Sequence, residues 1–122
     1  MTTTADIAAD LVALCKAGKF TEAGEKYWSD DVSSVEAGSP AGGDPVSRGK
    51  SAVRGKGEWW TANHDIHSME VHGPYLNADQ FTVRFVIDVT FKETGQRMQM
   101  DEVALYTVRD GKIAEERFFV GG

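Results

Sequence analysis

Apolar residues near the start of the chain recur with the period of an α-helix. Between Ala5 and Ala17 they follow an i, i+4, i+7, i+8 spacing, which predicts an amphipathic helix. Thr4 is the expected N-cap, and Gly18 is expected to end the helix because glycine adopts the conformation that follows a C-terminus. The positions expected to face the core are Ile7, Leu11, Leu14 and Cys15.

Two further segments have helical spacing. The first runs from Lys19 to about Trp28, although Gly24 makes this helix less favourable than alanine would, by about 1 kcal/mol. The second runs from Lys50 to about Asn63, with Trp59 turned roughly 100° away from its inward face. The inward positions are Phe20, Ala23 and Tyr27 in the first helix, and Val53, Gly57, Trp60 and the following His64 in the second.

The second half of the chain changes to the two-residue period of β-strands. Turn-forming residues separate the alternating segments, which predicts hairpins between long antiparallel strands. Helices followed by such strands predict an α+β fold, a single domain over residues 1–122, with the helices packed on one face of a curved, mostly antiparallel sheet. The expected strands are Ile66–His72, Gln80–Phe91, Arg97–Val108 and Lys112–Val120, after a short strand at Val32–Ala37 and a Gly- and Pro-rich loop from Gly38 to Pro45.

Glu102 interrupts a strand face that is otherwise apolar. Its neighbours on that face are Met98, Met100, Ala104, Tyr106 and Val108, so we expect the face to point inward. In the last strand the two faces are equally apolar, and alternation alone leaves the direction of Glu116 open. The same holds for Glu36 at the end of the short first strand.

Composition excludes several classes of function. A chain of 122 residues with a net charge of −6 has no electrostatic reason to bind nucleic acid or an anionic membrane. Cys15 is the one cysteine, and no segment approaches the about 20 consecutive apolar residues of a membrane-spanning helix. The N-terminus has neither the basic start nor the apolar run of a signal peptide, so we expect a cytoplasmic protein.

The order of these elements, with RGKSAV at 48–53 before the third helix and VRDGKI at 108–113 in the last turn, resembles the SnoaL-like branch of the nuclear transport factor 2-like superfamily. The resemblance covers nearly the whole chain. It implies a cone in which helices lie in the hollow of a bent sheet, a pocket at the wide end, and a homodimer through the outer sheet face. The family includes polyketide cyclases, ketosteroid isomerases, dehydratases, epoxide hydrolases and non-catalytic binders.

The resemblance also suggests roles for individual residues. It places Glu36 where the steroid isomerases have their catalytic aspartate. The second acid of those enzymes falls at Ala104, and their tyrosines fall near Leu11 and Gly57, so steroid isomerase chemistry is not expected. Glu102 lies one inward position from Ala104, on the strand where the polyketide cyclases carry an acidic residue. In the last strand, the resemblance turns Ala114, Glu116, Phe118 and Val120 inward.

Three glutamates in one apolar hollow would favour their protonated forms, because burial and mutual repulsion both raise a carboxyl pKa. A carboxyl group that titrates near neutral pH is suited to general acid or base catalysis. We therefore expect Glu102 and Glu36 to be catalytic. The expected substrate-binding residues are Trp60, Tyr106, Glu116, His64, Met100 and Phe118. The alternative is that Glu36 and Glu116 meet Arg48, Arg84 or solvent at the mouth of the cone.

Two other site types are not expected. His64, Asp65, His67 and His72 are close in the sequence, but the segment crosses from a helix into a strand and places His67 and His72 on opposite faces, which is not typical of a metal site. The RGKS segment lacks the glycine of a phosphate-binding loop, since position 44 is Asp44.

Two functions remain from the sequence. One is an acid/base enzyme without cofactor or metal that isomerises, cyclises or dehydrates a small, apolar or aromatic, oxygen-bearing molecule. The other is a ligand-binding or accessory homodimer that uses the same hollow without chemistry. A second hydrogen-bond donor on the first helix would favour the enzyme, and Leu11 and Leu14 do not supply one.

Overall fold

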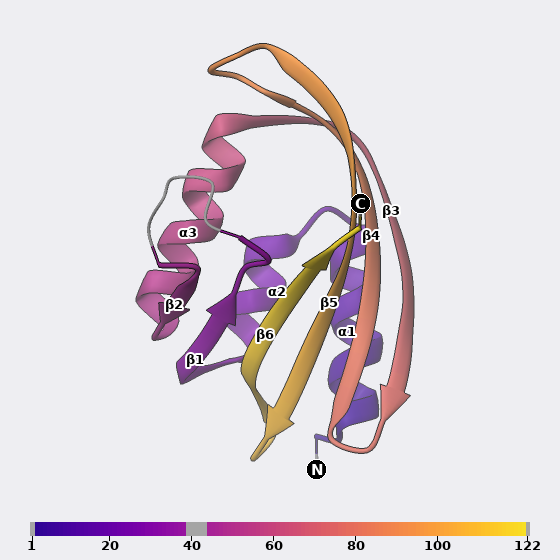
Figure 1. Ribbon diagram of the computed structural model, residues 1–122. Coiled ribbons are helices and arrows are strands. Elements are labelled where there is room, and N and C mark those ends of the chain that lie inside the picture. The colour runs from indigo at the N-terminus through magenta and orange to yellow at the C-terminus, as the bar shows by residue number, and fades with distance from the viewer. Residues whose placement is uncertain (1, 39–43, 122) are drawn as a thin grey trace.

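A curved, open sheet holds the helices against its concave face (Figure 1). The computed structural model describes residues 2–38 and 44–121. The α+β fold predicted from the sequence is confirmed. Its elements are α1 (Thr4–Lys16), α2 (Phe20–Tyr27), β1 (Trp28–Val35), β2 (Val46–Arg48), α3 (Lys50–Asn63), β3 (His64–Asn77), β4 (Gln80–Phe91), β5 (Gln96–Arg109) and β6 (Lys112–Val120).

The strands are arranged in the order β2-β1-β6-β5-β4-β3. Neighbouring strands are antiparallel except β1 and β6, which are parallel. In Figure 1, α1 lies behind β4 and β5, whereas α3 stands apart from the long strands and the β4–β5 hairpin arches over its end. This arrangement places α3 and the inner faces of β4 and β5 on opposite sides of the molecule's interior.

The first helix begins one residue earlier than predicted. Thr3, and not Thr4, is the N-cap: the Asp6 amide donates to the Thr3 hydroxyl, and the Thr3 amide donates to the Asp6 carboxylate, each at 3.1 Å. This reciprocal capping box requires an acceptor three residues after the cap, which Asp6 supplies for Thr3. The buried residues are Ile7, Ala8, Leu11, Val12 and Cys15, and Leu14 is only partly buried.

The contact between Gly24 and Trp28 explains why α2 contains a glycine despite the low helix propensity of this residue. A Cβ atom at this position would lie 2.5 Å from Cη2 and 2.6 Å from Cε2 of Trp28. The indole therefore packs directly on the helix backbone, and no other residue type leaves that space. Ala23 and Tyr27 are buried as predicted, whereas Phe20 is 37% exposed at the rim of the interior.

The third helix has the bounds that its period predicts. Val53 is buried, Trp60 packs partly buried against the core, and Trp59 is half exposed, as the spacing indicates. The bounds of β4 and β6 also match. β1 begins and ends earlier than predicted, so that Glu36 follows the strand, while β3 and β5 extend beyond their predicted bounds at both ends. β2 was not predicted because its three residues lie within a polar segment. Residues 39–43 of the expected loop lie outside the described residues.

One inward position of β6 was predicted wrongly. Val108 pairs with Ile113, but the preceding Thr107 pairs with Glu115, so Ala114 is an extra residue in a bulge. Ile113 is consequently the fully buried residue at this level, and Ala114 lies on the outer side. Beyond the bulge the predicted parity holds, and the inward residues pair across the sheet as Tyr106 with Glu116, Ala104 with Phe118, and Glu102 with Val120.

Candidate functional site

A hollow of about 680 Å³ lies between α2, α3 and the inner face of the sheet. Its walls are mostly apolar, and it contains all three glutamates singled out from the sequence. It is large enough for a small organic molecule. The apolar walls come chiefly from Trp28, Trp59, Trp60, Met69, Phe85, Ile87, Met100 and Phe118.

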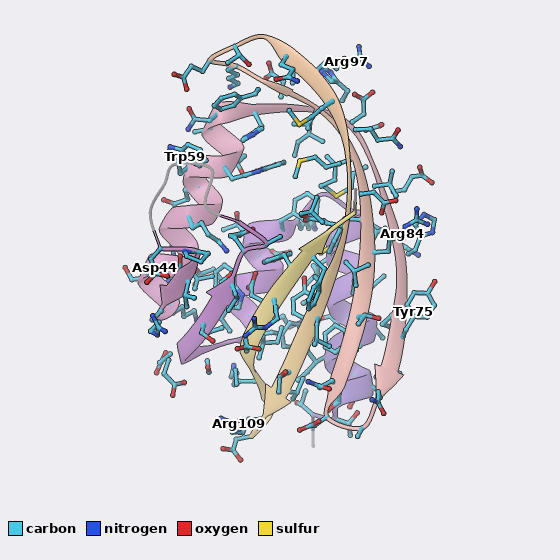
Figure 2. All side chains as sticks on the ribbon, viewed as in Figure 1. Asp44, Trp59, Tyr75, Arg84, Arg97 and Arg109 are labelled. Carbon is cyan, nitrogen blue, oxygen red and sulfur yellow. The ribbon has the colours of Figure 1, made fainter. Side chains whose placement is uncertain are left out.

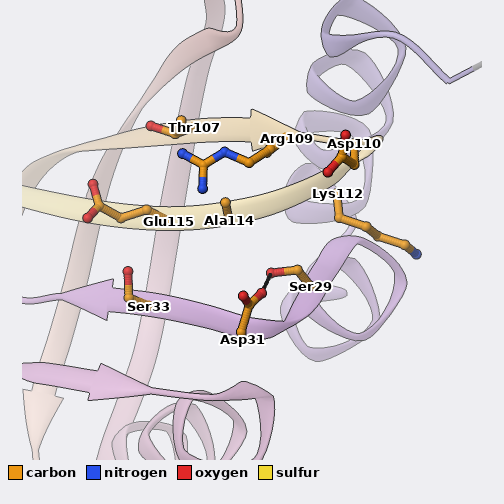
Figure 3. A pocket seen from close by; sticks show the side chains of 9 residues that line it. All are labelled: Ser29, Asp31, Ser33, Thr107, Arg109, Asp110, Lys112, Ala114 and Glu115. Atoms are coloured by element: carbon orange, nitrogen blue, oxygen red, sulfur yellow. Dashed lines mark hydrogen bonds between the residues drawn. The ribbon is translucent and has the colours of Figure 1, made fainter.

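A second hollow, of about 450 Å³, lies on the other side of the sheet and has a different character. Figure 3 shows its polar side chains on adjacent parts of β5, β6 and β1, with Ser29 donating to Asp31. None of the predicted site residues lines it. The outer face also carries bidentate ion pairs of Arg84 with Asp101 and Arg97 with Asp88, and both arginines project away from the interior in Figure 2.

Glu116 is the most deeply buried of the three glutamates, with 7% of its surface exposed. The Trp28 indole N–H donates to its Oε1 at 2.5 Å. Burial raises the pKa of Glu116, against the lowering effects of the Lys56 charge and of hydrogen bonds from Trp28 and Ser34. Glu116 is thus buried within a polar network and separated from open solvent.

Glu36 follows the end of β1 and forms an ion pair across the hollow. Its Oε1 lies 2.5 Å from Nζ of Lys56 on α3. The same ammonium donates to the Ser34 hydroxyl and lies 5.2 Å from the centroid of the Phe118 ring. The arginines considered from the sequence pair elsewhere, Arg48 with Asp44 and Arg84 with Asp101. Lys56 is therefore the cation that holds Glu36.

Glu102 lies on the inner face of β5, half-buried in the wall of the hollow. Burial raises its pKa to about 7; the charges of Glu36 and Glu116 add to this effect, and that of Lys56 opposes it. No hydrogen bond or ion pair joins its carboxyl group to another side chain in residues 2–38 and 44–121. Glu102 thus combines access to the hollow, an available carboxyl group and a pKa close to neutrality.

Most of the predicted substrate-binding residues also line this hollow. Trp60, Tyr106, Met100, Phe118 and Glu116 all do so. Tyr106 is buried and stacks on Phe81, with ring centroids 4.8 Å apart, and burial raises the pKa of its hydroxyl.

His64 is placed differently from the other predicted residues. It lies behind Trp60 and does not line the hollow. Its ring stacks on the Trp60 indole at 4.3 Å between centroids, and its Nδ1 lies 2.7 Å from the Trp60 carbonyl oxygen. Because a carbonyl oxygen only accepts, Nδ1 must carry the proton. His64 supports Trp60 from outside the hollow.

Sequence reasoning missed Lys56, Trp28 and Ser34. Lys56 follows Val53 by three residues and precedes Trp60 by four, so its inward position was visible in the helical period. Lysine is usually exposed, which conceals such a position in a hydrophobicity pattern. Trp28 gave no such signal, because its partner Glu116 is 88 residues away in the sequence.

Cys15 lines the hollow as a buried thiol. Burial, aided by the nearby Glu116 charge, raises its pKa to about 12, which makes it a poor nucleophile. Within the described ranges, no three His, Cys, Asp or Glu side chains are grouped as metal ligands would be. No helix in that part of the chain has the length and apolarity to cross a membrane.

Comparisons with known proteins agree with this architecture. A structure from Mesorhizobium loti, named as a SnoaL-like polyketide cyclase with carbohydrate phosphatase in brackets, is 53% identical, with a TM-score of 0.91 over 96% of this chain and 98% of that one. A Burkholderia thailandensis protein named NTF2-like has 20% identity and a TM-score of 0.82, with 99% and 92% of the two chains covered. A Bacillus subtilis protein named as an isomerase has 18% sequence identity and a TM-score of 0.79, with 98% of this chain and 89% of that one covered.

The last two likenesses show the fold alone, because their sequence identities are low. No curated protein matches the chain. The family described as the SnoaL-like domain matches residues 1–120. With nearly the full length matched and the M. loti structure more than half identical, the chain belongs to the SnoaL-like domain family, within the NTF2-like fold.

Proposed function

We propose that the hollow binds a small, largely apolar molecule with a carbonyl group, and that Glu102 transfers a proton on it. The observation that carries this proposal is the half-buried, unpaired carboxyl group of Glu102, with a pKa of about 7, in the wall of an apolar hollow. Such a group is present in both protonation states near neutral pH, as a general acid/base catalyst requires. The name of the M. loti relative as a polyketide cyclase is consistent with a substrate of this class.

In the proposed step, the Glu102 carboxylate removes a proton from a carbon atom next to the substrate carbonyl. The electron pair of the broken C–H bond forms the enolate, and the negative charge moves to the carbonyl oxygen. Where a C=C bond lies next to the deprotonated carbon, the enolate is a dienolate, and protonated Glu102 returns the proton at the far end of that bond, which moves the double bond into conjugation with the carbonyl and isomerises the substrate. Alternatively, the enolate carbon attacks a second carbonyl, which closes a ring, and the new alkoxide takes the proton. Neither route changes the oxidation level overall, so neither needs a redox cofactor.

Deuterium exchange tests this proposal without knowledge of the natural substrate. Cyclic and aryl ketones are incubated with the protein in D₂O, and the loss of the proton signal beside the carbonyl is followed by ¹H NMR. We expect exchange above the buffer rate for at least one ketone, and a loss of roughly 10²- to 10⁴-fold in Glu102→Gln, the usual contribution of a general base. Exchange that is equally fast in Glu102→Gln would refute the assignment.

The second candidate is a non-catalytic ligand-binding module, for which the family resemblance implies a homodimer. The observation in its favour is that Glu36 is already neutralised by Lys56, so the hollow holds one uncommitted carboxyl group and not a catalytic pair. The same experiment separates the candidates. Ketones that bind in a thermal-shift assay, but that exchange no faster than in buffer, would support the module and exclude the enzyme.

A further inference from the structure

Lys56 occupies an unusual position for a lysine. It lies between Val53 and Trp60 on the inward face of α3, and 26% of its side chain is exposed. Lys56 and Arg54 are the basic residues among the described side chains that line the hollow. Arg54 donates from Nε and Nη2 to both carboxylate oxygens of Glu25, outside the network of glutamates. Lys56 is thus the cation that faces the interior.

We propose that Lys56 is a catalytic residue whose ammonium group binds the substrate oxygen on which negative charge develops while Glu102 holds the proton. This inference rests on the proposed function and adds the anion-stabilising partner that the proposed proton transfer requires. An enolate in a largely apolar hollow needs a hydrogen-bond donor or a positive charge, since apolar walls do not stabilise its negative charge. The tyrosine positions of the steroid isomerases, which fall near Leu11 and Gly57, supply neither group.

Strand register places Glu102 on the same wall of the hollow as the Phe118 ring that Lys56 contacts. The ammonium lies 5.2 Å from the Phe118 ring centroid. Phe118 pairs with Ala104, and Ala104 is one inward position from Glu102 on β5. The Lys56 charge also lowers the pKa of Glu102, which requires the two groups to be close in space. A small ketone in the hollow could therefore contact the carboxyl group with its carbon atom and the ammonium with its oxygen.

The local contacts orient the ammonium toward the hollow. An ammonium group has three N–H donors. Glu36 and Ser34, both at the β1 side, accept two of these. The negative face of the Phe118 ring is a further neighbour of the ammonium. An enolate oxygen carries a full charge and would take the third donor in preference to the ring, since charge-assisted hydrogen bonds are stronger than contacts with a ring face.

Binding of a phenolate tests this inference independently of any turnover. The negative charge of the enolate exists only while Glu102 is protonated, and Glu102→Gln reproduces that neutral state. The probe is 4-nitrophenolate, whose charged oxygen resembles that of an enolate. Its affinity is measured in Glu102→Gln and in Glu102→Gln/Lys56→Gln, at a pH where the probe is ionised. The uncharged 4-nitroanisole serves as the reference ligand, because it reports on the shape of the hollow alone.

We expect Lys56→Gln to weaken 4-nitrophenolate binding by roughly ten- to a hundredfold and to leave 4-nitroanisole binding unchanged, which corresponds to the loss of one charge-assisted hydrogen bond. Lys50→Gln in the same Glu102→Gln background is the matched control, because Lys50 lies on the same helix and faces Glu25. In the Glu102→Gln background, Glu36→Gln should strengthen phenolate binding by freeing the ammonium.

Three results would overturn the inference. The first is that phenolate binds equally well with and without Lys56. The second is that Lys56→Gln weakens the binding of 4-nitrophenolate and 4-nitroanisole by the same factor. The third is that Glu102→Gln binds no phenolate. Because binding is measured without proton exchange, these results are separate from the deuterium test. Exchange that depends on Glu102 together with Lys56-independent phenolate binding would refute the role of Lys56 alone.

Discussion

Replacement of Glu102 with glutamine should stabilise the protein at neutral and alkaline pH. The folded state holds this carboxyl group with a pKa of about 7, against an ordinary value of 4.5. The folded state therefore binds a proton more tightly than the unfolded state does. Below pH 4.5 both states are protonated, and the group has no net effect on the free energy of unfolding. Between pH 4.5 and 7 the unfolded state loses its proton first, so stability falls as pH rises.

The size of this effect follows from the pKa difference. Each pKa unit corresponds to about 1.4 kcal/mol, so a change from 4.5 to about 7 lowers the free energy of unfolding by about 3 kcal/mol once the pH exceeds 7. Glutamine preserves the shape and cannot ionise, and therefore removes this cost. For a chain of 122 residues, about 3 kcal/mol corresponds to a rise in Tm of roughly 10 °C.

Urea unfolding at pH 4 and pH 8, followed by circular dichroism, measures the difference. Glu102→Gln should match the wild type at pH 4 and exceed it by about 3 kcal/mol at pH 8. Glu93→Gln is the matched control, since Glu93 is exposed in the β4–β5 turn and the same charge change there should have little effect. A Glu102→Gln protein that is equally or less stable than the wild type at pH 8 would refute the argument that burial disfavours this charge.

Three further predictions concern the surroundings of the hollow. Trp28→Phe removes the indole donor to Glu116, so the pKa of Glu116 should rise further. The free energy of unfolding should fall by about 1–3 kcal/mol at pH 8 and by less at pH 4. Equal losses at the two pH values would contradict this prediction. Gly24→Ala should lower the free energy of unfolding by about 1–3 kcal/mol, because the new Cβ atom overlaps Trp28. Gly55→Ala, where a Cβ atom meets nothing within 4 Å, should raise it by about 1 kcal/mol, as measured by urea unfolding. An increase at both positions would show that the indole moves freely. Cys15 should react with 5,5′-dithiobis(2-nitrobenzoate) only in urea, and prompt labelling of the native protein would contradict its burial.

The pattern of the sequence predicted those features that depend on local period. The α3, β4 and β6 bounds follow from clear helical or alternating spacing. The inward direction of Glu102 follows in the same way, because its neighbours on that face are apolar. Glu36 and Glu116 could not be oriented by pattern alone, since both faces of their strands are similar, and the family resemblance suggested the direction that the structure has.

Features that depend on contacts between distant segments were not predictable. The bulge at Ala114 adds one residue to β6, and nothing in the local alternation of apolar and polar residues indicates it. Ala114 was therefore expected to point inward, whereas its neighbour Ile113 does so. The ion pair of Lys56 with Glu36 crosses from α3 to the end of β1. A lysine on a helical face is ordinarily solvated, and the fold of the opposite wall is needed to reveal its partner.

A pH titration of the Glu102 side-chain carboxyl carbon by ¹³C NMR tests the central claim most directly. The resonance is assigned by its absence from the spectrum of Glu102→Gln. The structure predicts a midpoint of about 7, because the carboxyl group is half-buried beside two other glutamates. A midpoint near the ordinary 4.5 would contradict the account, since Glu102 would then be a solvated carboxylate with little capacity to donate a proton at neutral pH.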